Sequence, residues 1–310
     1  MTTLGQTADD YLRLRRALGH KLADAGRLLP HLVSYLESIG LETITIEAAL
    51  DWARQPDVDP TSTVWLSRMA VARGFARHLA GSDPRTQVPP TGMLSSRRHR
   101  RVPYIYSSAE ITSLMTQVRL TIRSPFRAAT IETLFGLLAA TGMRVGEAIR
   151  LVDRSDIDWR EDLAVIRESK FGKSREVPFQ ASTRQALAAY AHRRDQLRAC
   201  DKAPSFFVSI IGTRLLYQDV LITFRQLTAA ARIGAQSSTL PHIHDLRHSF
   251  AVHTLVDWYR NGEDVQARLP SLATYLGHCE PRSTYWYLSG APELLGSAAG
   301  RLEAFEEVQP

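Results

Sequence analysis

Four short segments of this sequence place cationic or hydroxyl-bearing side chains at points where helices and strands are expected to begin or end. They are ATGMRVGEAIRL (140–151), ESKFGKSREVPF (168–179), HDLRHSFAVHTL (244–255) and LGHCEPRSTYWYL (276–288). In the third segment, His244 and Arg247 are three residues apart at the start of a predicted helix, so their side chains share one face and can approach one anion. The N-terminus of that helix favours the same anion. The spacing therefore predicts an anion site.

Each of these side chains also has an ordinary structural explanation. Arg144 follows the helix break at Gly142 and can point into a cleft, or it can be a surface arginine paired with Glu147. His244 can cap a helix or lie in the core. The run Tyr285–Tyr287 is aromatic throughout, and alternate residues in it face different ways, so at least one of them is expected in the core. Single segments leave both explanations open.

The sequence offers no convincing site for a metal or a cofactor. His244 and His248 have the i, i+4 spacing of a zinc pair, but no glutamate lies between them and Arg247 would repel a cation. No Walker-type glycine and lysine pattern is present, and no acidic cluster suggests paired magnesium ions. We therefore expect neither a metal nor a cofactor.

The order of the predicted elements divides the chain into two domains and a linker. Residues 1–88 show helical periodicity over residues 11–27, 28–39, 46–54 and 61–79. Residues 89–103 are rich in Pro, Ser and Arg, and their basic run 97–101 is either a solvated tether or a contact for a phosphate backbone. Residues 104–310 form the second domain.

The second domain is predicted to be mostly helical with one β-hairpin. Ser107 or Ser108 can cap a helix, and Gly142 is expected to end the helix over residues 126–140. Two strands, 163–168 and 174–179, flank a turn at 169–173. Further helices are expected at residues 183–199, 217–231, 245–257, 270–276 and 283–288. The predicted fold class is mainly α with a small antiparallel β-sheet.

Composition narrows the class of protein further. The 310 residues are 44% hydrophobic and 23% charged, which is typical of a folded globular chain. No long apolar run suggests a membrane span or a signal peptide, and Cys200 and Cys279 are too few for a disulfide framework, so a cytoplasmic protein is expected. Lysine occurs only four times among 38 cations with a net charge of +6. The arginine excess suits phosphate binding, although a GC-rich genome would have the same effect.

Taken together and in order, the four segments resemble the tyrosine recombinase, or phage integrase, family. The resemblance covers most of residues 104–290, and the helical module before a basic linker is similar to the DNA-clamping, core-binding domain of that family. It implies six catalytic residues: Arg144, Lys170, His244, Arg247, His278 and Tyr287.

Three assignments depend on distances along the chain. Tyr287 lies nine residues after His278, as the family nucleophile does, whereas Tyr285 does not fit. Lys170 lies eight residues before Pro178 and matches the family lysine, with Lys173 as the alternative. Glu147 resembles the acidic residue that commonly follows the first arginine and supports the site.

The resemblance implies a reaction that breaks and remakes DNA strands without water or ATP. The Tyr287 hydroxyl would attack the scissile phosphorus, leaving a 3′-phosphotyrosyl bond and a free 5′-hydroxyl. Arg144 and Arg247, helped by His278, would stabilise the charge on the non-bridging oxygens. His244 would accept the tyrosine proton, and Lys170 would protonate the departing 5′-oxygen.

The expected partner is double-stranded DNA, bound within a homotetramer that forms the synapse of a mobile or chromosomal element. The segment 291–308 would dock on a neighbouring protomer or on its own domain. Two alternatives remain at this point. One is a non-catalytic accessory subunit of a recombinase, and the other is a type IB topoisomerase, which shares the chemistry but relaxes supercoils without a specific site.

Overall fold

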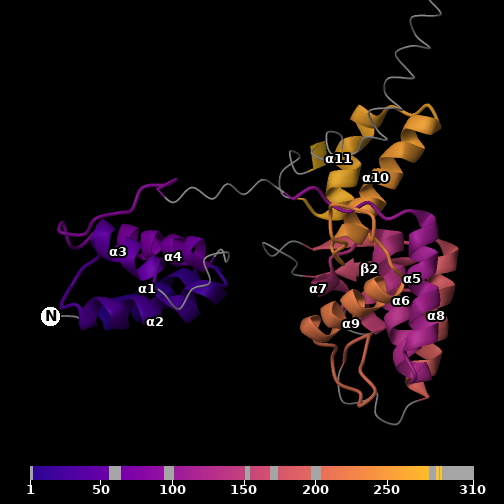
Figure 1. The fold of residues 1–310 in the computed structure, drawn as a ribbon, viewed down its shortest axis with the longest axis horizontal. Coiled ribbons are helices and arrows are strands. Elements are labelled where there is room, and N and C mark those ends of the chain that lie inside the picture. The colour runs from indigo at the N-terminus through magenta and orange to yellow at the C-terminus, as the bar shows by residue number, and fades with distance from the viewer. Residues whose placement is uncertain are drawn as a thin grey trace, which may run out of the picture. The chain divides into compact units, whose positions relative to one another are not determined.

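The computed structural model describes residues 3–55, 64–93, 101–150, 154–167, 174–196, 204–278, 284–285 and 287. The chain divides into two compact units, Met1–Arg100 and Arg101–Pro310, and Figure 1 shows the fold of each. Helices dominate both units, and the larger unit adds a small antiparallel sheet. The predicted fold class is confirmed.

The smaller unit contains four helices around its own apolar core. They are α1 (Leu4–Ala17), α2 (Ala23–Ser38), α3 (Ile46–Ala53) and α4 (Val64–Leu79). Leu32, Trp52 and Phe75 are fully buried between them. The break between the first two helices was predicted at residues 27–28, but it lies at residues 18–22. Gly19 and Leu22 adopt left-handed backbone conformations there and interrupt the helix. The apolar spacing continues through this break, so periodicity alone does not reveal it.

The ends of the predicted linker are bonded to the units beside them. Arg73 of α4 donates from Nε and Nη2 to the carbonyl oxygens of Pro89 and Pro90, at 2.8 and 2.9 Å. At the other end, Arg101 makes hydrogen bonds within the larger unit. Residues 94–100, which hold most of the basic run, lie outside the described residues.

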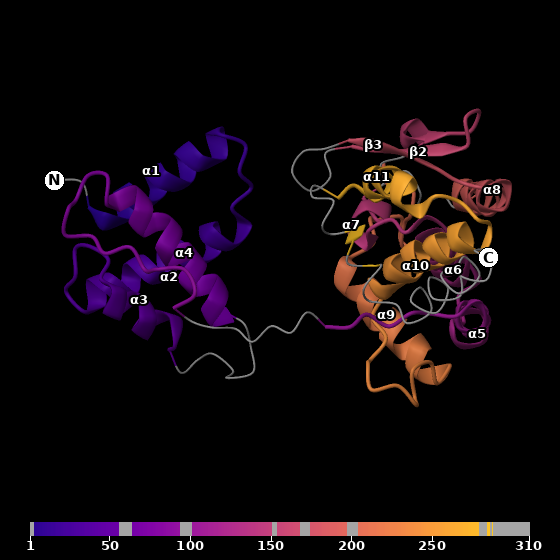
Figure 2. The ribbon, with the colours of Figure 1, turned by 90° about the horizontal axis from the view of Figure 1, so that it is seen from above.

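The larger unit is organised around one central helix, as Figure 2 shows from above. That helix, α6, packs against α5, α8 and α10, and its buried residues Leu134, Phe135 and Leu138 form the middle of the core. The helices of this unit are α5 (Ser108–Thr121), α6 (Pro125–Thr141), α7 (Val145–Ala148), α8 (Ala181–Asp195), α9 (Tyr217–Ala230), α10 (Asp245–Arg260) and α11 (Val265–Leu276).

The predicted hairpin is present and has one further strand. Strands β2 (Leu163–Ile166) and β3 (Arg175–Pro178) pair antiparallel, with Ile166 opposite Arg175, and β1 (Ile157–Asp158) pairs with β2 on its other edge. A short 3₁₀ turn, η1 (Arg154–Asp156), precedes β1. Strand β3 packs against α11. The predicted turn 169–173, with Lys170 and Lys173, lies outside the described residues.

Two helix starts show how capping decides boundaries. Ser107, one of the two predicted caps, is the residue that caps α5, and it exchanges hydrogen bonds with Glu110 in a capping box. The start of α11 was predicted at Pro270, but the helix begins five residues earlier because the Asp264 side chain accepts a hydrogen bond from the amide of Ala267. Pro270 therefore lies inside α11.

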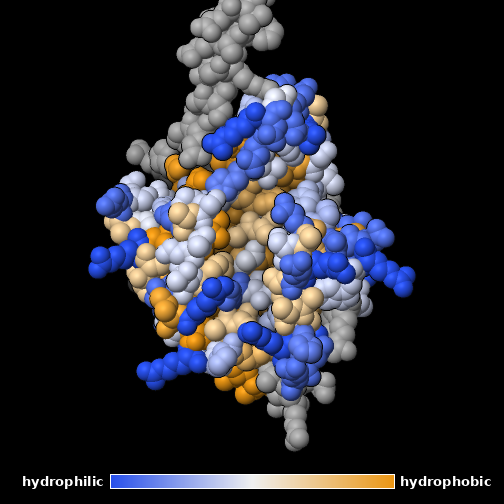
Figure 3. Space-filling view, turned by 90° about the vertical axis from the view of Figure 1, so that its right-hand side faces the viewer, coloured by the Kyte–Doolittle hydropathy of each residue, from blue (hydrophilic) through white to orange (hydrophobic). Residues whose placement is uncertain are grey.

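One face of the larger unit is hollowed between α5, α6 and α8. The hollow has a volume of about 790 Å³, and small and apolar residues such as Ala128, Ala129 and Gly136 lie in it, with Arg119 and Arg193 among the charged residues. Figure 3 shows apolar surface between hydrophilic side chains on this side of the unit. None of the predicted catalytic residues that the structure describes lines this hollow.

Among the described residues, no helix has both the length and the apolar character that crossing a membrane requires.

Gly142 ends α6 in a left-handed conformation, with φ of 60°, and a methyl group there would lie 2.6 Å from Cδ1 of Phe250. We expect Gly142→Ala to lower the free energy of unfolding by about 2 kcal/mol or more, through backbone strain and overpacking. Gly136→Ala is the matched control, because it lies in the same helix with open space around it and should raise stability by roughly 0.5–1 kcal/mol. Denaturant unfolding of both variants measures the difference, and equal effects would contradict the explanation.

Candidate active site

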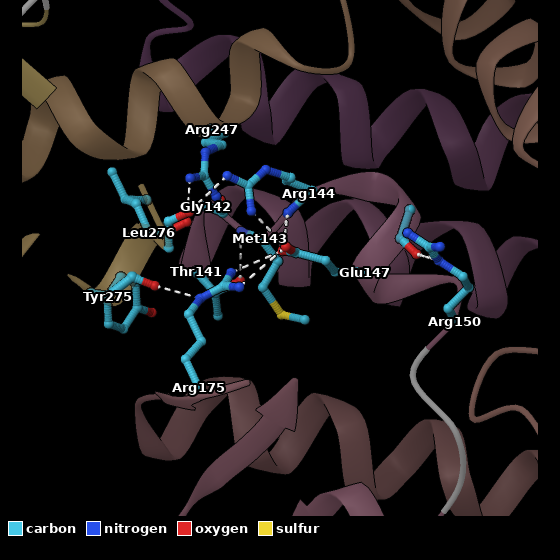
Figure 4. A network of polar contacts seen from close by, with 12 residues as sticks. Thr141, Gly142, Met143, Arg144, Glu147, Arg150, Arg175, Arg247, Tyr275 and Leu276 are labelled. Atoms are coloured by element: carbon cyan, nitrogen blue, oxygen red, sulfur yellow. Dashed lines mark hydrogen bonds and ion pairs between the residues drawn. The ribbon is translucent and has the colours of Figure 1, made fainter. Parts of the chain in front are cut away.

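The C-terminus of α11 is where three arginines meet. Gly277 ends this helix in a left-handed conformation, and the carbonyl oxygens of Tyr275–Gly277 accept hydrogen bonds, in that order, from Arg175, Arg247 and Arg144 (Figure 4). The bonds from Arg175 Nε and Arg144 Nη2 measure 2.8 and 3.0 Å. The last carbonyls of a helix have no partner within the helix and carry partial negative charge. They are therefore suitable acceptors for guanidinium groups.

A single carboxylate, Glu147 in the first turn of α7, joins two of these arginines. Its Oε1 accepts from Arg144 Nη1 at 2.7 Å and from Arg175 Nη1 at 3.1 Å, while its Oε2 accepts from Arg175 Nη2 at 2.8 Å. Oε2 also accepts from the backbone amide of Arg144 at 3.0 Å. Burial alone would raise the pKa of Glu147, but the hydrogen bonds and charge of Arg175, together with Arg144, lower it to about 2. Glu147 is therefore ionised at neutral pH.

Arg247 is the most deeply buried of the three arginines. Its Nη1 donates to the carbonyl of Gly142 at 2.8 Å, at the end of α6, and its Nη2 donates to Leu276. Burial, and then the charge of Arg144, lower the pKa of Arg247 to about 10, so it remains protonated at neutral pH. From the first turn of α10, Arg247 therefore bonds the C-terminal ends of α6 and α11.

Three histidines and Tyr287 follow one another through ring contacts. The ring centroid of Tyr287 lies 6.0 Å from that of His278 and 5.4 Å from that of His248, whose ring lies edge-on to His244 at 5.0 Å. Nδ1 of His278 and Oγ1 of Thr284 are hydrogen-bonded at 2.8 Å, which fixes the plane of that imidazole. Tyr287 is only 3% exposed and packs with apolar residues of α10 and α11.

His244 lies at the outer end of this group, immediately before α10. The residue is solvent-exposed, yet desolvation of its ring and the charge of Arg247 lower its pKa below 6.5. The imidazole is therefore mostly neutral near pH 7 and can accept a proton. Within the residues that the structure describes, no group of three or more His, Cys, Asp or Glu side chains could hold a metal ion.

Comparison with known proteins identifies the family. Residues 107–293 match the phage integrase family. The chain is 42% identical over 310 residues to the protein designated integrase/recombinase y4rB from Sinorhizobium fredii, covering 98% of both chains. It is 30% identical over 293 residues to the tyrosine recombinase XerD of Brucella abortus, covering 91% of this chain and 85% of that one. The chain belongs to the phage integrase family. The predicted resemblance is confirmed, and by family the chain is a tyrosine-type site-specific recombinase.

Solved structures of tyrosine recombinases share its fold at low sequence identity. The XerH recombinase bound to its difH substrate is similar with a TM-score of 0.65 at 16% identity, covering 97% of this chain and 85% of that one. The Tn1549 transposon integrase in complex with circular intermediate DNA has a TM-score of 0.66 at 15% identity, covering 98% and 100%.

Five of the six residues predicted for the recombinase site lie in the described part of the larger unit. Arg144 and Arg247 share the end of α11, and His244, His278 and Tyr287 are linked to them through ring contacts or electrostatic influence. Lys170 and its alternative Lys173 lie outside the described residues.

The sequence interpretation did not include two residues that lie in this candidate site. Arg175 shares the inner face of β3 with buried Val177, and a cation on the core-facing side of a strand is a signal that alternation reveals. His248 was considered as half of a zinc pair, but its i, i+4 spacing from His244 already places both rings on one face of the helix.

Gly277 of the LGH segment has a geometric role beside Arg175. Its φ is 66°, and a methyl group there would lie 2.9 Å from Arg175 Nη1 and 3.1 Å from Cζ. The glycine therefore allows both the left-handed end of α11 and the passage of the guanidinium over it.

Glu147→Gln tests how strongly one carboxylate stabilises the arginine group. Because the folded-state pKa lies below the ordinary 4.5, the carboxylate stabilises the fold fully above that pH, and this contribution is lost as the pH falls towards 2. We expect the variant to lose roughly 3 kcal/mol of unfolding free energy at neutral pH, since one pKa unit corresponds to about 1.4 kcal/mol. The difference from the wild type should shrink at acid pH.

Urea unfolding of both proteins at about pH 7 and about pH 3 measures the effect. Glu132→Gln removes a more exposed partner of Arg119 and is the matched control, with an expected loss of at most about 1 kcal/mol. A difference between wild type and Glu147→Gln that stayed constant over this pH range would contradict the assignment.

Proposed function

We propose that this tyrosine recombinase cleaves and rejoins DNA at a specific site through a 3′-phosphotyrosyl intermediate, with Tyr287 as the nucleophile. The observation that carries the proposal is the position of Tyr287 beside His278 and His248, in the same unit as the three arginines. The charge interaction with Tyr287 also raises the pKa of Arg247, which supports the proximity of the two side chains. Attack by its hydroxyl on the scissile phosphorus forms the phosphotyrosyl bond and breaks the bond to the 5′-oxygen.

The arginines are proposed to stabilise the negative charge that develops on the non-bridging oxygens. The Arg144 side chain is 25% exposed and Arg247 is buried, so Arg144 is the more open to a bound phosphate. Both are held by protein acceptors before DNA binds, so little rearrangement is needed when the charge develops. His278, fixed by Thr284, is proposed to add a further donor.

Proton transfer completes the reaction. His244 is proposed to accept the Tyr287 proton, and its lowered pKa supports this role because the neutral imidazole is available near pH 7. His248 lies between them, because its ring contacts both that of His244 and that of Tyr287. Lys170 is proposed to protonate the 5′-oxygen. Lysine is better suited to this role than arginine, because its ammonium group can release a proton.

The proposed partner is double-stranded DNA, and the proposed assembly is a homotetramer that synapses two sites in the cytoplasm. The solved relatives in complex with DNA support the partner. Residues 1–88 are proposed as a DNA-clamping domain joined by the basic linker 89–103 to the catalytic domain, 104–310. Phosphate contacts would supply most of the affinity, so binding should weaken steeply with salt. The tail 291–308 lies outside the described residues, and its docking stays a prediction.

Tyr287→Phe tests the nucleophile. On a nicked suicide substrate, the wild type should accumulate a protein–DNA adduct that resists denaturation, and Tyr287→Phe should form none because the attacking hydroxyl is gone. Tyr285→Phe is the matched control: its side chain is 53% exposed, and it should form the adduct at the wild-type rate. Gel electrophoresis after denaturation measures the adduct.

The same substrates separate the two alternative functions. Specific DNA binding by the wild type with no adduct would contradict the proposal and favour an accessory subunit. Adduct formation together with relaxation of plasmids that lack the target would favour a type IB topoisomerase.

Lys170→Ala tests the general acid. The variant should cleave an ordinary substrate slowly, by a factor on the order of 10² to 10⁴, and recover on a substrate with a 5′-bridging phosphorothiolate, whose sulfur leaves without protonation. Lys173→Ala is the control on the same turn and should show neither the defect nor the recovery. Single-turnover cleavage rates measure both, and rescue of Lys173→Ala in place of Lys170→Ala would transfer the role.

A further inference from the structure

The chain that leaves the linker lies against the start of α10, the turn that presents His244 and Arg247. The backbone amide of Tyr106 donates to Ser249 Oγ at 2.8 Å, and the Tyr106 hydroxyl donates to the carbonyl of His242 at 3.1 Å. Figure 1 shows this segment passing beside α10 before α5 begins. The segment that follows the linker is therefore bonded to the start of α10.

Asp245 is the buried anion of this turn. Its side chain is 3% exposed, and its Oδ2 accepts from the backbone amide of His242 at 2.9 Å. The same oxygen forms an ion pair with Arg101 Nη2. The carboxylate thus closes the turn from residue 242 to residue 245, and His244 lies within that turn.

Arg101 bonds both ends of the segment that leads into α10. Besides its ion pair with Asp245, it donates from Nη1 to the carbonyl of Leu240 at 2.5 Å. A buried carboxylate that loses its counter-charge is strongly destabilised, and the backbone around it shifts to find other donors or water. Removing the Arg101 guanidinium would therefore disturb residues 240–245, although Arg101 is not among the residues assigned to the reaction.

We propose that Arg101 is a positioning residue for the recombinase site. By neutralising Asp245 and bonding Leu240, it holds the turn that sets the positions of His244 and Arg247 relative to the scissile phosphate. This inference rests on the proposed function of His244 and Arg247. It also connects the linker to catalysis, because Arg101 lies near the end of the predicted linker and is the first residue of the larger unit.

A direct contact with DNA is the competing explanation for the same residue. The Arg101 side chain is 41% exposed and is the last residue of the basic run 97–101, so it could contact a phosphate. A phosphate contact contributes to affinity and to its salt dependence, whereas a positioning contact contributes to the rate of the bound complex. The two explanations therefore differ in what a substitution changes.

Arg101→Gln is the decisive variant, measured as single-turnover cleavage of the nicked substrate at saturating protein, with duplex affinity measured separately against salt. We expect cleavage to slow by about tenfold to a hundredfold, since small displacements of reacting groups have effects of this size, with affinity nearly unchanged. Arg101→Lys keeps the charge but lacks the fork that bonds Leu240 and Asp245 together, so it should recover the rate only in part.

Asp245→Asn removes the charge from the other side and completes a double-mutant cycle. If the two residues act through one ion pair, the double variant should be no slower than the slower single variant. Arg119→Gln is the matched control, because it breaks an arginine–glutamate pair on another surface and should cleave like the wild type. Thermal unfolding of each variant identifies any that fails to fold, in which case the comparison of Arg101→Gln with Arg101→Lys decides.

Three results would overturn the inference. They are an unchanged cleavage rate for Arg101→Gln, a loss confined to affinity with a shallower salt dependence, and single-variant defects that multiply in the double variant. A wild type that forms no adduct would instead contradict the proposed function, so the two failures are distinguishable.

Discussion

The structure of this site depends on one constraint: three consecutive carbonyl oxygens at the end of α11 each hold one arginine. The residues Tyr275–Gly277 accept from three guanidinium groups that come from α7, β3 and α10. These elements are far apart in the sequence, and the helix end is their common acceptor. Because carbonyls at a helix C-terminus lack partners within the helix and carry partial negative charge, binding cations there satisfies both groups.

Three cations in one place repel one another, and Glu147 reduces that repulsion without removing it. The carboxylate joins Arg144 and Arg175, while Arg247 has only backbone carbonyls as its described hydrogen-bond partners. One formal negative charge therefore faces three positive ones, and the excess is available to a bound phosphate. The pKa of Arg247, lowered to about 10, reflects both burial and the neighbouring charge of Arg144.

Tyr287, the proposed nucleophile, packs against apolar residues of α10 and α11. His248 and His278 both contact the ring of Tyr287, and His244 continues the series towards solvent. The start of α10 is bonded in turn to Arg101 near the end of the linker and to Tyr106 in the segment after it. The ends of α6 and α11, the left-handed Gly277 and the end of the linker thus all contribute to positioning the side chains of the candidate site.

The sequence by itself determined the fold class, the hairpin, most helix positions and the family, because periodicity, caps and four motifs in order are local signals. It also indicated five catalytic candidates that the described structure brings into one unit. It did not reveal Arg175 or the place of His248 between His244 and Tyr287, and it misplaced the starts of α2 and α11. Only the tertiary structure decided these, because a hydrogen bond from β3 to the end of α11 joins residues a hundred positions apart. No local pattern encodes the distance between two elements that meet only after the core has packed.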